Sequence, residues 1–361
     1  MKQILCLADE PWSSVPGRTQ QLVSRLRDTQ VLYFEPAGGR RDRRLPGKGR
    51  RVRPNVTVYT LPPRLLEAPE QFKTLFRAGQ RRTAAYLTAR AEKHRFREPL
   101  LWTTRPEQVH LLDFLSYGGL VYDCGRVFDD LPPQWEGSLA QAADVVFAAS
   151  PHLVRRLAPC SGNIALLPNG VNYPLFSADV ERRDPLPQVR GPVLGWAGTV
   201  RDGLDLDPLL YAARSRPDWS FLLLGRVEEG RLPRAIWRQS NILCHGACPV
   251  DEVPDWLYRC DVLLELLRED RPYDGVVSPR LYEYLSTGKP VVSMLWPDQV
   301  EPFPDVVYAA HDEPEFLTMC QHALEEAEGF VTQRRMDYGA AAAWPLRAGE
   351  VARILSTAGL L

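Results

Sequence analysis

The chain has 361 residues, of which 45% are hydrophobic and 25% charged, the composition of an ordinary soluble globular protein. Its length exceeds the size at which single cores usually stop growing, so we expect two domains. No apolar run approaches the roughly 18 residues of a transmembrane helix, and seven scattered cysteines do not fit a disulfide framework.

The net charge of −1 hides an uneven distribution along the chain. Residues 1–175 hold 25 Lys and Arg against 16 Asp and Glu, whereas the remainder holds 19 against 29. This asymmetry favours an acidic partner for the first half. The apolar start, Ile4 to Leu7, is too short for a signal peptide. We therefore expect a cytoplasmic location, extending to the inner face of the membrane.

Strands and helices alternate through the first half. The pattern predicts a strand at Lys2–Leu7, a Pro/Gly loop, a helix from about Thr19 to Arg27 and a strand at 31–35. A long basic helix at 69–96 follows. Further strands are predicted at 99–103, 120–123 and 145–149, and the segment 164–171 closes this half with a turn.

The second half repeats this rhythm. Strands are predicted at 192–198, 219–225 and 261–265, and helices at 206–215 and 250–259. Continuous apolar strands between helices indicate parallel sheets that are covered on both faces. We predict an α/β protein of two Rossmann-like domains facing across a cleft, with residues 1–175 and 190–340 as the domains. A linker near 172–190 joins them, and residues 341–361 return to the first.

The most informative segment runs from Ser278 to Val292. Ser278 suits an N-cap, and Pro279 suits the first helical position. Gly288 can end the helix in a left-handed conformation, after which an apolar strand follows. The unpaired N–H groups of such a helix start attract a phosphate, and Glu283 lies about one turn further on. The pattern predicts a nucleotide-sugar site, although many such helix–strand units bind nothing.

This segment resembles the donor-binding signature of glycosyltransferases with the B-type fold, particularly retaining family 4 and its bacterial surface polysaccharide branch. Glu283 matches the second glutamate of the signature. The first would fall at Gly275, with Asp274 one position away. Segments at 144–150, 167–171 and 195–198, together with the tail from Trp344, occur in the order of this branch.

The resemblance implies a transfer from a UDP-, GDP- or dTDP-sugar to a glycan or lipid-linked acceptor, with retention and without a cofactor or metal. It places the donor diphosphate near Gly198 and Thr199, and it places a glycine near the donor and acceptor at Gly17. Arg280 matches the basic residue of the branch. Because leaving-group charge grows in the transition state, a bound cation is needed. Arg280 is the first candidate, ahead of Arg201 and Arg226, and each could instead be a surface salt-bridge residue.

Fewer residues are candidates for catalysis than for donor binding. Asp123 ends a predicted strand facing the cleft, at a point where many family members carry a histidine, and we take it as the candidate catalytic residue. His110 lies on a predicted helix and is expected to pack rather than to react. No Asp-x-Asp motif follows a strand, which predicts activity without a divalent metal.

The segment Arg40–Arg53 holds eight cations in fourteen residues. It lacks interleaved aromatics, so nucleic acid fits poorly. Anionic lipid fits better, since each cation near a negative surface gains about 1 kcal/mol. A plain solvated loop is the alternative. Cys244-His245-Gly246-Ala247-Cys248 resembles half a zinc site, but no second pair stands at ligand spacing. Packed thiols are expected there.

Two other function classes compete with a transferase. A nucleotide-sugar epimerase of similar architecture would convert the donor without an acceptor, and it would need acid and base groups at the cleft. A non-catalytic sugar-nucleotide-binding protein is favoured by the missing first glutamate. A dinucleotide oxidoreductase is disfavoured, because neither half shows Gly-x-Gly-x-x-Gly after its first strand.

Overall fold

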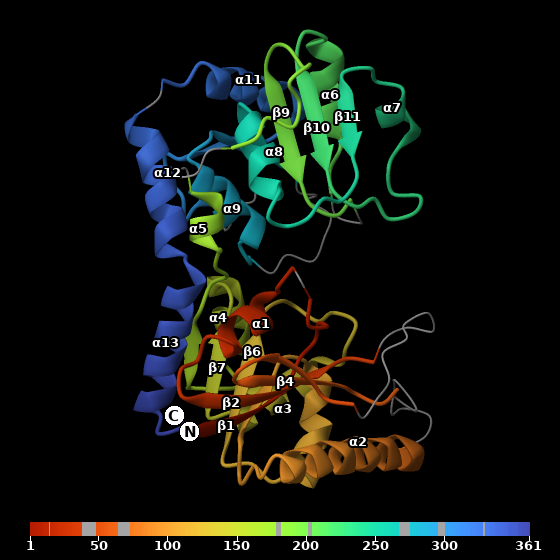
Figure 1. Ribbon diagram of the computed structural model, residues 1–361, viewed down its shortest axis with the longest axis vertical. Helices are drawn as coiled ribbons and strands as arrows, with labels where there is room; N and C mark the ends of the chain where they lie inside the picture. Colours follow the sequence, from red (N-terminus) through yellow and green to blue (C-terminus); the bar gives the residue numbers. More distant parts are fainter. Residues whose placement is uncertain are drawn as a thin grey trace. The chain divides into compact units, whose positions relative to one another are not determined.

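The computed structural model describes residues 1–13, 15–37, 48–63, 73–177, 182–200, 204–266, 275–294, 300–327 and 329–361. The chain forms two compact units (Figure 1). Unit 1 comprises Met1–Pro168 and Pro345–Leu361, and unit 2 comprises Asn169–Trp344. The division therefore falls a few residues before the linker that we expected near 172–190. In the described part of the chain, no helix is long and apolar enough to cross a membrane.

Unit 1 is built on an eight-stranded sheet in which only the edge strand β3 is antiparallel. The strands are β1 (Lys2–Leu7), β2 (Thr29–Glu35), β3 (Arg50–Arg53), β4 (Val56–Thr60), β5 (Leu100–Thr103), β6 (Gly119–Cys124), β7 (Val145–Ala148) and β8 (Ile164–Leu166). Their order is β3-β4-β2-β1-β5-β6-β7-β8. The chain thus builds outward from β1 on one side, then returns to build β5 on the other. This reversal makes β1/β5 the switch point at which open α/β sheets place ligands.

The helices of unit 1 are α1 (Arg18–Val23), α2 (Lys73–Lys93), the 3-10 helix η1 (Pro106–Phe114), α3 (Pro133–Ala142), α4 (Pro151–Leu157) and α13 (Trp344–Thr357), whose first residue belongs to unit 2. Two expectations need correction. The first helix ends at Val23 rather than Arg27. The basic segment is not entirely a loop, because Arg50–Arg53 pairs with β4; its residues 40–47 lie outside the described residues.

Unit 2 holds a six-stranded parallel sheet in the order β11-β10-β9-β12-β13-β14. The strands are β9 (Val193–Ala197), β10 (Ser220–Leu224), β11 (Ile242–His245), β12 (Val262–Glu265), β13 (Val291–Met294) and β14 (Val307–Ala310). The order reverses between β9 and β12, which is the switch point of this sheet. The α/β class and the two parallel-sheet domains predicted from the sequence are confirmed.

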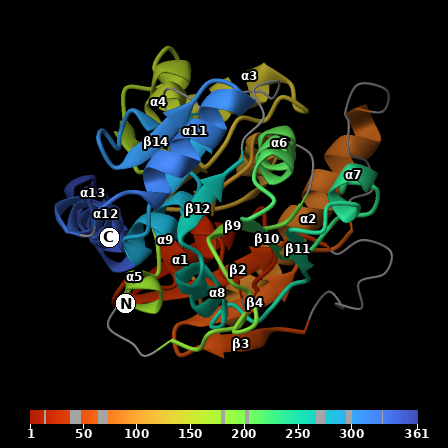
Figure 2. The ribbon, with the colours of Figure 1, turned by 90° about the horizontal axis from the view of Figure 1, so that it is seen from above.

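Helices cover both faces of the second sheet, as its apolar strands require. They are α5 (Tyr173–Phe176), α6 (Asp207–Ser215), α7 (Arg234–Trp237), α8 (Val253–Arg259), α9 (Pro279–Thr287), α11 (Glu313–Leu324) and α12 (Phe330–Ala341). Figure 2 shows α6 and α11 on one side of β9, β10 and β12, with α8 and α9 on the other. Two hydrophobic cores follow, one around Trp256 and Tyr284, and one around Trp196 and Phe316.

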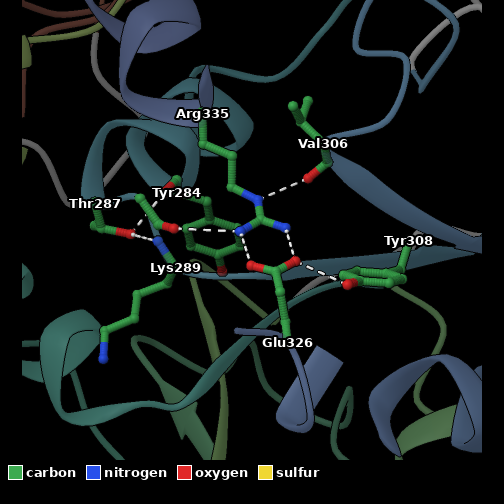
Figure 3. Close-up of polar contacts among 8 residues, drawn as sticks. Tyr284, Thr287, Lys289, Val306, Tyr308, Glu326 and Arg335 are labelled. Carbon is green, nitrogen blue, oxygen red and sulfur yellow. Dashed lines mark hydrogen bonds and ion pairs between the residues drawn. The ribbon is translucent and has the colours of Figure 1, made fainter. Parts of the chain in front are cut away.

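A buried ion pair fastens α12 to the rest of unit 2 (Figure 3). Arg335 is fully buried, and its Nη1 and Nη2 each lie 2.6 Å from a carboxylate oxygen of Glu326. Its Nε donates to the Val306 carbonyl at 2.8 Å, and the Tyr308 hydroxyl donates to Glu326 at 2.8 Å. Because a buried charge left alone is costly, this network makes the packing of α12 specific.

Candidate functional site

The predicted helix start at Ser278 forms as expected. The Ser278 hydroxyl accepts a hydrogen bond from the Leu281 N–H at 3.2 Å, which caps α9. Gly288 ends the helix with φ 75°, a left-handed conformation that favours glycine. The helix places its first turn beside the carboxyl end of β12, because Ser278 also donates to Glu265 at 3.4 Å.

Arg280 is held by a buried carboxylate. Its Nε lies 2.8 Å from Oε2 of Glu265, and its Nη2 lies 2.5 Å from Oε1. Glu265 is buried, whereas the Arg280 side chain remains 21% exposed. Burial alone would lower the pKa of Arg280, but the paired Glu265 raises it, so the guanidinium stays charged. A fixed cation therefore lies at the switch point with one edge turned toward solvent.

The carboxyl end of β9 is shaped around this guanidinium. A Cβ at Gly198 would lie 2.8 Å from Arg280 Nη1 and 2.9 Å from the Trp196 ring. The guanidinium lies over that ring, 5.0 Å from its centroid, in a cation–π contact. Glycine at 198 is thus required to keep the space that Arg280 occupies.

The backbone at the end of β10 also packs closely against the end of β9. A Cβ at Gly225, which follows β10, would lie 1.8 Å from the Gly198 carbonyl oxygen, so no larger residue fits. Thr199 comes next along the chain and is partly buried. Arg226 is exposed, and its carbonyl accepts from the Val200 N–H at 2.8 Å. The backbone at Gly198 and Gly225 and the side chain of Arg280 thus lie together at the carboxyl edge of the sheet.

Two predicted donor residues, Arg201 and Asp274, lie outside the described residues. Gly275, where the family signature has its first glutamate, is described and has φ 63°. A side chain there would strain the backbone, so a glutamate is disfavoured by the conformation itself.

Glu283 lies on α9 close to both members of the ion pair. Burial raises its pKa to about 7, with a further raising effect from Glu265 and an opposing one from Arg280. Its side chain keeps partial exposure to solvent. A carboxyl that titrates near neutrality beside a fixed cation is a strong acceptor for hydroxyl groups when it is ionised.

The switch point of unit 1 holds a different pair. Asp123, at the end of β6, is buried, and its Oδ1 accepts from Arg18 Nε at 2.8 Å. Burial raises the pKa of Asp123, and Arg18 opposes this. The buried Oδ2 has no hydrogen-bond partner among the described residues. The Trp102 N–H lowers this pKa too, yet it does not reach hydrogen-bond geometry with Oδ2.

Other groups gather near the end of β1. Burial raises the pKa of Asp9 to about 6, and neighbouring Glu10 and Asp123 add to the effect. Gly17 precedes α1, where a Cβ would lie 2.1 Å from Glu10 Oε2. The space above Gly17 is therefore filled by a carboxylate of the chain itself.

Two motifs outside the candidate sites are packing groups. His110 lies between Phe76 and Trp135, with ring centroids 5.0 Å and 4.7 Å away, and burial lowers its pKa. His245 packs on Trp256 at 4.1 Å. Within the described ranges, no three His, Cys, Asp or Glu side chains gather as a metal ion would require.

Sequence reasoning missed Glu265, Arg18 and Asp9 as site residues. Each stands at or just past a strand end or at a helix start on the carboxyl edge of a sheet, where ligands bind in open α/β folds. A buried acid at the end of an apolar strand, such as Glu265, was the signal available in the sequence.

Comparisons with known proteins bear on the fold and on the family that the second unit resembles. Residues 206–343 match a family model described as glycosyl transferase-like. A glycosyltransferase of Bacillus subtilis (strain 168) named for teichuronic acid biosynthesis, TuaH, is 28% identical over 251 residues, or 62% of this chain. The match spans 63% of the length of that relative.

Solved structures match almost the whole chain. Sucrose-phosphate synthase from Thermosynechococcus elongatus has a TM-score of 0.76 at 16% identity, with 99% of both chains covered. The Anabaena protein HepE in complex with UDP has a TM-score of 0.71 at 16% identity and covers 99% of this chain and 100% of its own. The chain thus has the fold of B-type glycosyltransferase structures, and residues 206–343 of its second unit are similar to a glycosyl transferase-like family.

Proposed function

We propose that this protein is a glycosyltransferase that moves a sugar from a nucleoside-diphosphate sugar to a glycan or a lipid-linked saccharide. The observation that carries the proposal is the fixed Arg280 cation at the β9/β12 switch point, held by buried Glu265 at 2.8 and 2.5 Å. The similarity to TuaH and the UDP-bound neighbour support the same reading and make UDP the first nucleotide to test.

Arg280 has the role of binding the donor diphosphate. Its Nη1 edge faces the space over Gly198, and the capped start of α9 lies directly beside it. As the bond between the anomeric carbon and the diphosphate oxygen breaks, negative charge grows on that oxygen. A preorganised guanidinium stabilises this charge without having to reorganise.

Glu283 has the role of binding the ribose of the donor. It lies one helical turn from Arg280, and its ionised carboxylate accepts hydrogen bonds from hydroxyl groups. Charge-assisted hydrogen bonds of this kind are worth about 1.5–3 kcal/mol. The donor is then bound at two points: its phosphates contact Arg280, and its ribose hydroxyls donate to Glu283.

Unit 1 has the role of binding the acceptor. We assign the pair of Asp123 and Arg18 to orienting the acceptor, because Asp123 Oδ1 accepts from Arg18 Nε at 2.8 Å while Oδ2 is buried out of reach of a substrate. With retention, the hydroxyl oxygen bonds to the anomeric carbon on the face that the diphosphate leaves. Its proton passes to the departing phosphate oxygen, so no side-chain nucleophile is required.

One observation favours the non-catalytic alternative. The φ of 63° at Gly275 leaves the donor site without the first glutamate of the signature, which contacts the donor sugar in the family. A binding protein would keep Arg280 and Glu283 but release no nucleotide. Measuring nucleoside diphosphate release from a donor sugar in the presence of candidate acceptors separates the two functions.

Titration calorimetry with UDP, GDP and dTDP tests the donor site directly. Arg280→Gln should weaken diphosphate binding about tenfold or more, because a charge-assisted hydrogen bond is lost. Arg238→Gln, which removes an exposed arginine of the same unit, serves as the matched control and should bind as wild type does. Equal affinity in the two variants for every nucleotide that binds would refute the assignment of Arg280.

A further inference from the structure

A groove lies at the opposite edge of the first sheet, away from the strand ends that form the candidate site. It has a volume of about 590 Å³ and is lined by the start of β1, the turn between α1 and β2, and one face of α13. Lys2 and Thr29 are paired neighbours in the sheet, and both line it. This volume is in the range of small-molecule sites.

The groove carries a surplus of positive charge. Lys2, Arg25 and Arg27 line it, against one acid, Asp28. Burial lowers the pKa of Arg25, and the nearby charge of Arg53 on β3 lowers it further. Arg53 does not line the groove, but its like charge acts on Arg25, so an anion bound beside Arg25 would relieve this repulsion.

The wall formed by α13 keeps the groove open. Ala348, Gly349 and Ala352 present almost no side chain on this face. Gly349 stands in the interior of a helix, where glycine is less favourable than alanine. A Cβ at this position would meet nothing within 4 Å, so packing does not demand the glycine. An occupant of the groove would explain it.

We propose that this groove binds a phosphate group, carried either by a soluble phosphate compound or by an anionic lipid headgroup. Arg25 is pre-positioned for this role, because its Nη1 donates both to the Gln21 carbonyl at 3.1 Å and to the Gln21 side-chain oxygen, which holds the guanidinium in place. Guanidinium groups match phosphate oxygens through paired hydrogen bonds. The site is distinct from the donor site, since all of its residues belong to unit 1.

Calorimetry with inorganic pyrophosphate and co-sedimentation with vesicles test the proposal on the full chain. The vesicles are of phosphatidylcholine, with or without phosphatidylglycerol. One variant, Arg25→Gln with Arg27→Gln, removes charge. Another, Gly349→Leu, fills the groove and should fold normally, because leucine suits a helix better than glycine. Arg82→Gln with Lys93→Gln removes two exposed charges on α2 as a matched control.

In a parallel series, the wild type and every variant also carry Arg280→Gln, which removes pyrophosphate binding at the proposed donor site, so that the remaining binding reports on the groove. We expect both groove variants to lose binding about tenfold or more, and the control to keep it. Pyrophosphate binding without vesicle binding identifies a soluble ligand, and binding to phosphatidylglycerol vesicles identifies a lipid. Binding of neither probe, or groove variants that bind as the control does, would overturn the proposal, whatever becomes of the donor site.

Discussion

The two sheets share one construction and differ in what they offer a ligand. Each reverses its strand order beside its first strand, and each places an arginine–carboxylate pair at the carboxyl edge. In unit 2 both oxygens of Glu265 are bonded to Arg280, so the site presents a cation. In unit 1 Oδ1 of Asp123 accepts from Arg18, and Oδ2 is buried with no hydrogen-bond partner among the described residues.

This difference matches two kinds of substrate. The partly exposed guanidinium of Arg280 suits the phosphates of the proposed donor, whereas the more deeply buried pair in unit 1 suits a role in orienting the proposed acceptor. One type of residue pair on one type of sheet can therefore have different roles. The burial of each pair decides how much of its arginine a ligand can reach.

Breaking the Glu265–Arg280 pair in unit 2 should have the largest effect, a loss of stability. Glu265→Ala leaves Arg280 with an uncompensated, mostly buried charge, and it should lower the free energy of unfolding by about 3 kcal/mol. A shift of the urea midpoint measures this loss. The double variant Glu265→Leu with Arg280→Met should recover most of the stability but no nucleotide binding. If the double variant still binds UDP as tightly as wild type, the pair is only structural.

Breaking the pair in unit 1 should separate binding from turnover. Asp123→Asn keeps the shape of the side chain but removes its charge. We expect kcat to fall about tenfold to a hundredfold, the value of one charge-assisted hydrogen bond. UDP affinity should be unchanged, because the proposed donor site lies in unit 2. Steady-state kinetics and calorimetry measure the two effects. A matching loss of UDP affinity would contradict the division of labour.

The pKa of Glu283 gives a smaller, pH-dependent effect. Because its pKa of about 7 lies above the ordinary 4.5, the folded protein binds an extra proton between these values. Stability should therefore fall as pH rises from about 4.5 to 7 and level off above. UDP affinity should change in the opposite sense, rising through pH 7 as the carboxylate ionises.

Glu283→Gln isolates this effect from the titration of UDP itself. The variant should bind UDP about tenfold more weakly at pH 8 and should lose the protein's share of the pH dependence. Its stability should not fall, because a costly buried charge is removed. Identical pH profiles for wild type and variant would exclude Glu283 from the ribose site.

The smallest expected effect is that of a chelator. If Arg280 and the start of α9 supply the positive charge at the diphosphate, excess EDTA should leave the transfer rate unchanged. A rate that collapses and returns with Mg²⁺ or Mn²⁺ would mean that the diphosphate is bound through a metal rather than through Arg280.

Local patterns predicted much of the fold. The cap at Ser278, the left-handed Gly288 and the apolar strand after it depend on neighbouring residues, and the structure confirms them. The two parallel sheets follow from continuous apolar strands between helices. The strand at Arg50–Arg53 escaped detection because an edge strand rich in arginine has no apolar alternation.

The site depended on contacts that no local pattern contains. Arg18 meets Asp123 across 105 residues, and Arg280 meets Glu265 across 15. The sequence indicated Arg280 and Asp123 separately, but not that each has a charged partner. Which edge of a guanidinium or carboxylate stays available is set by tertiary packing, so the distinction between the two sites appeared only in the structure.

The discontinuity of unit 1 bears on how the protein is made. Its last segment, Pro345–Leu361, is synthesised only after the whole of unit 2. Domains usually fold in order from the ribosome, but here the first one cannot complete its contacts until the whole of unit 2 has been synthesised. While the roughly 176 residues of unit 2 are being synthesised, the surface of the N-terminal sheet that α13 later covers stays exposed. We therefore expect a chaperone that binds exposed apolar surface to bind the N-terminal sheet during this interval.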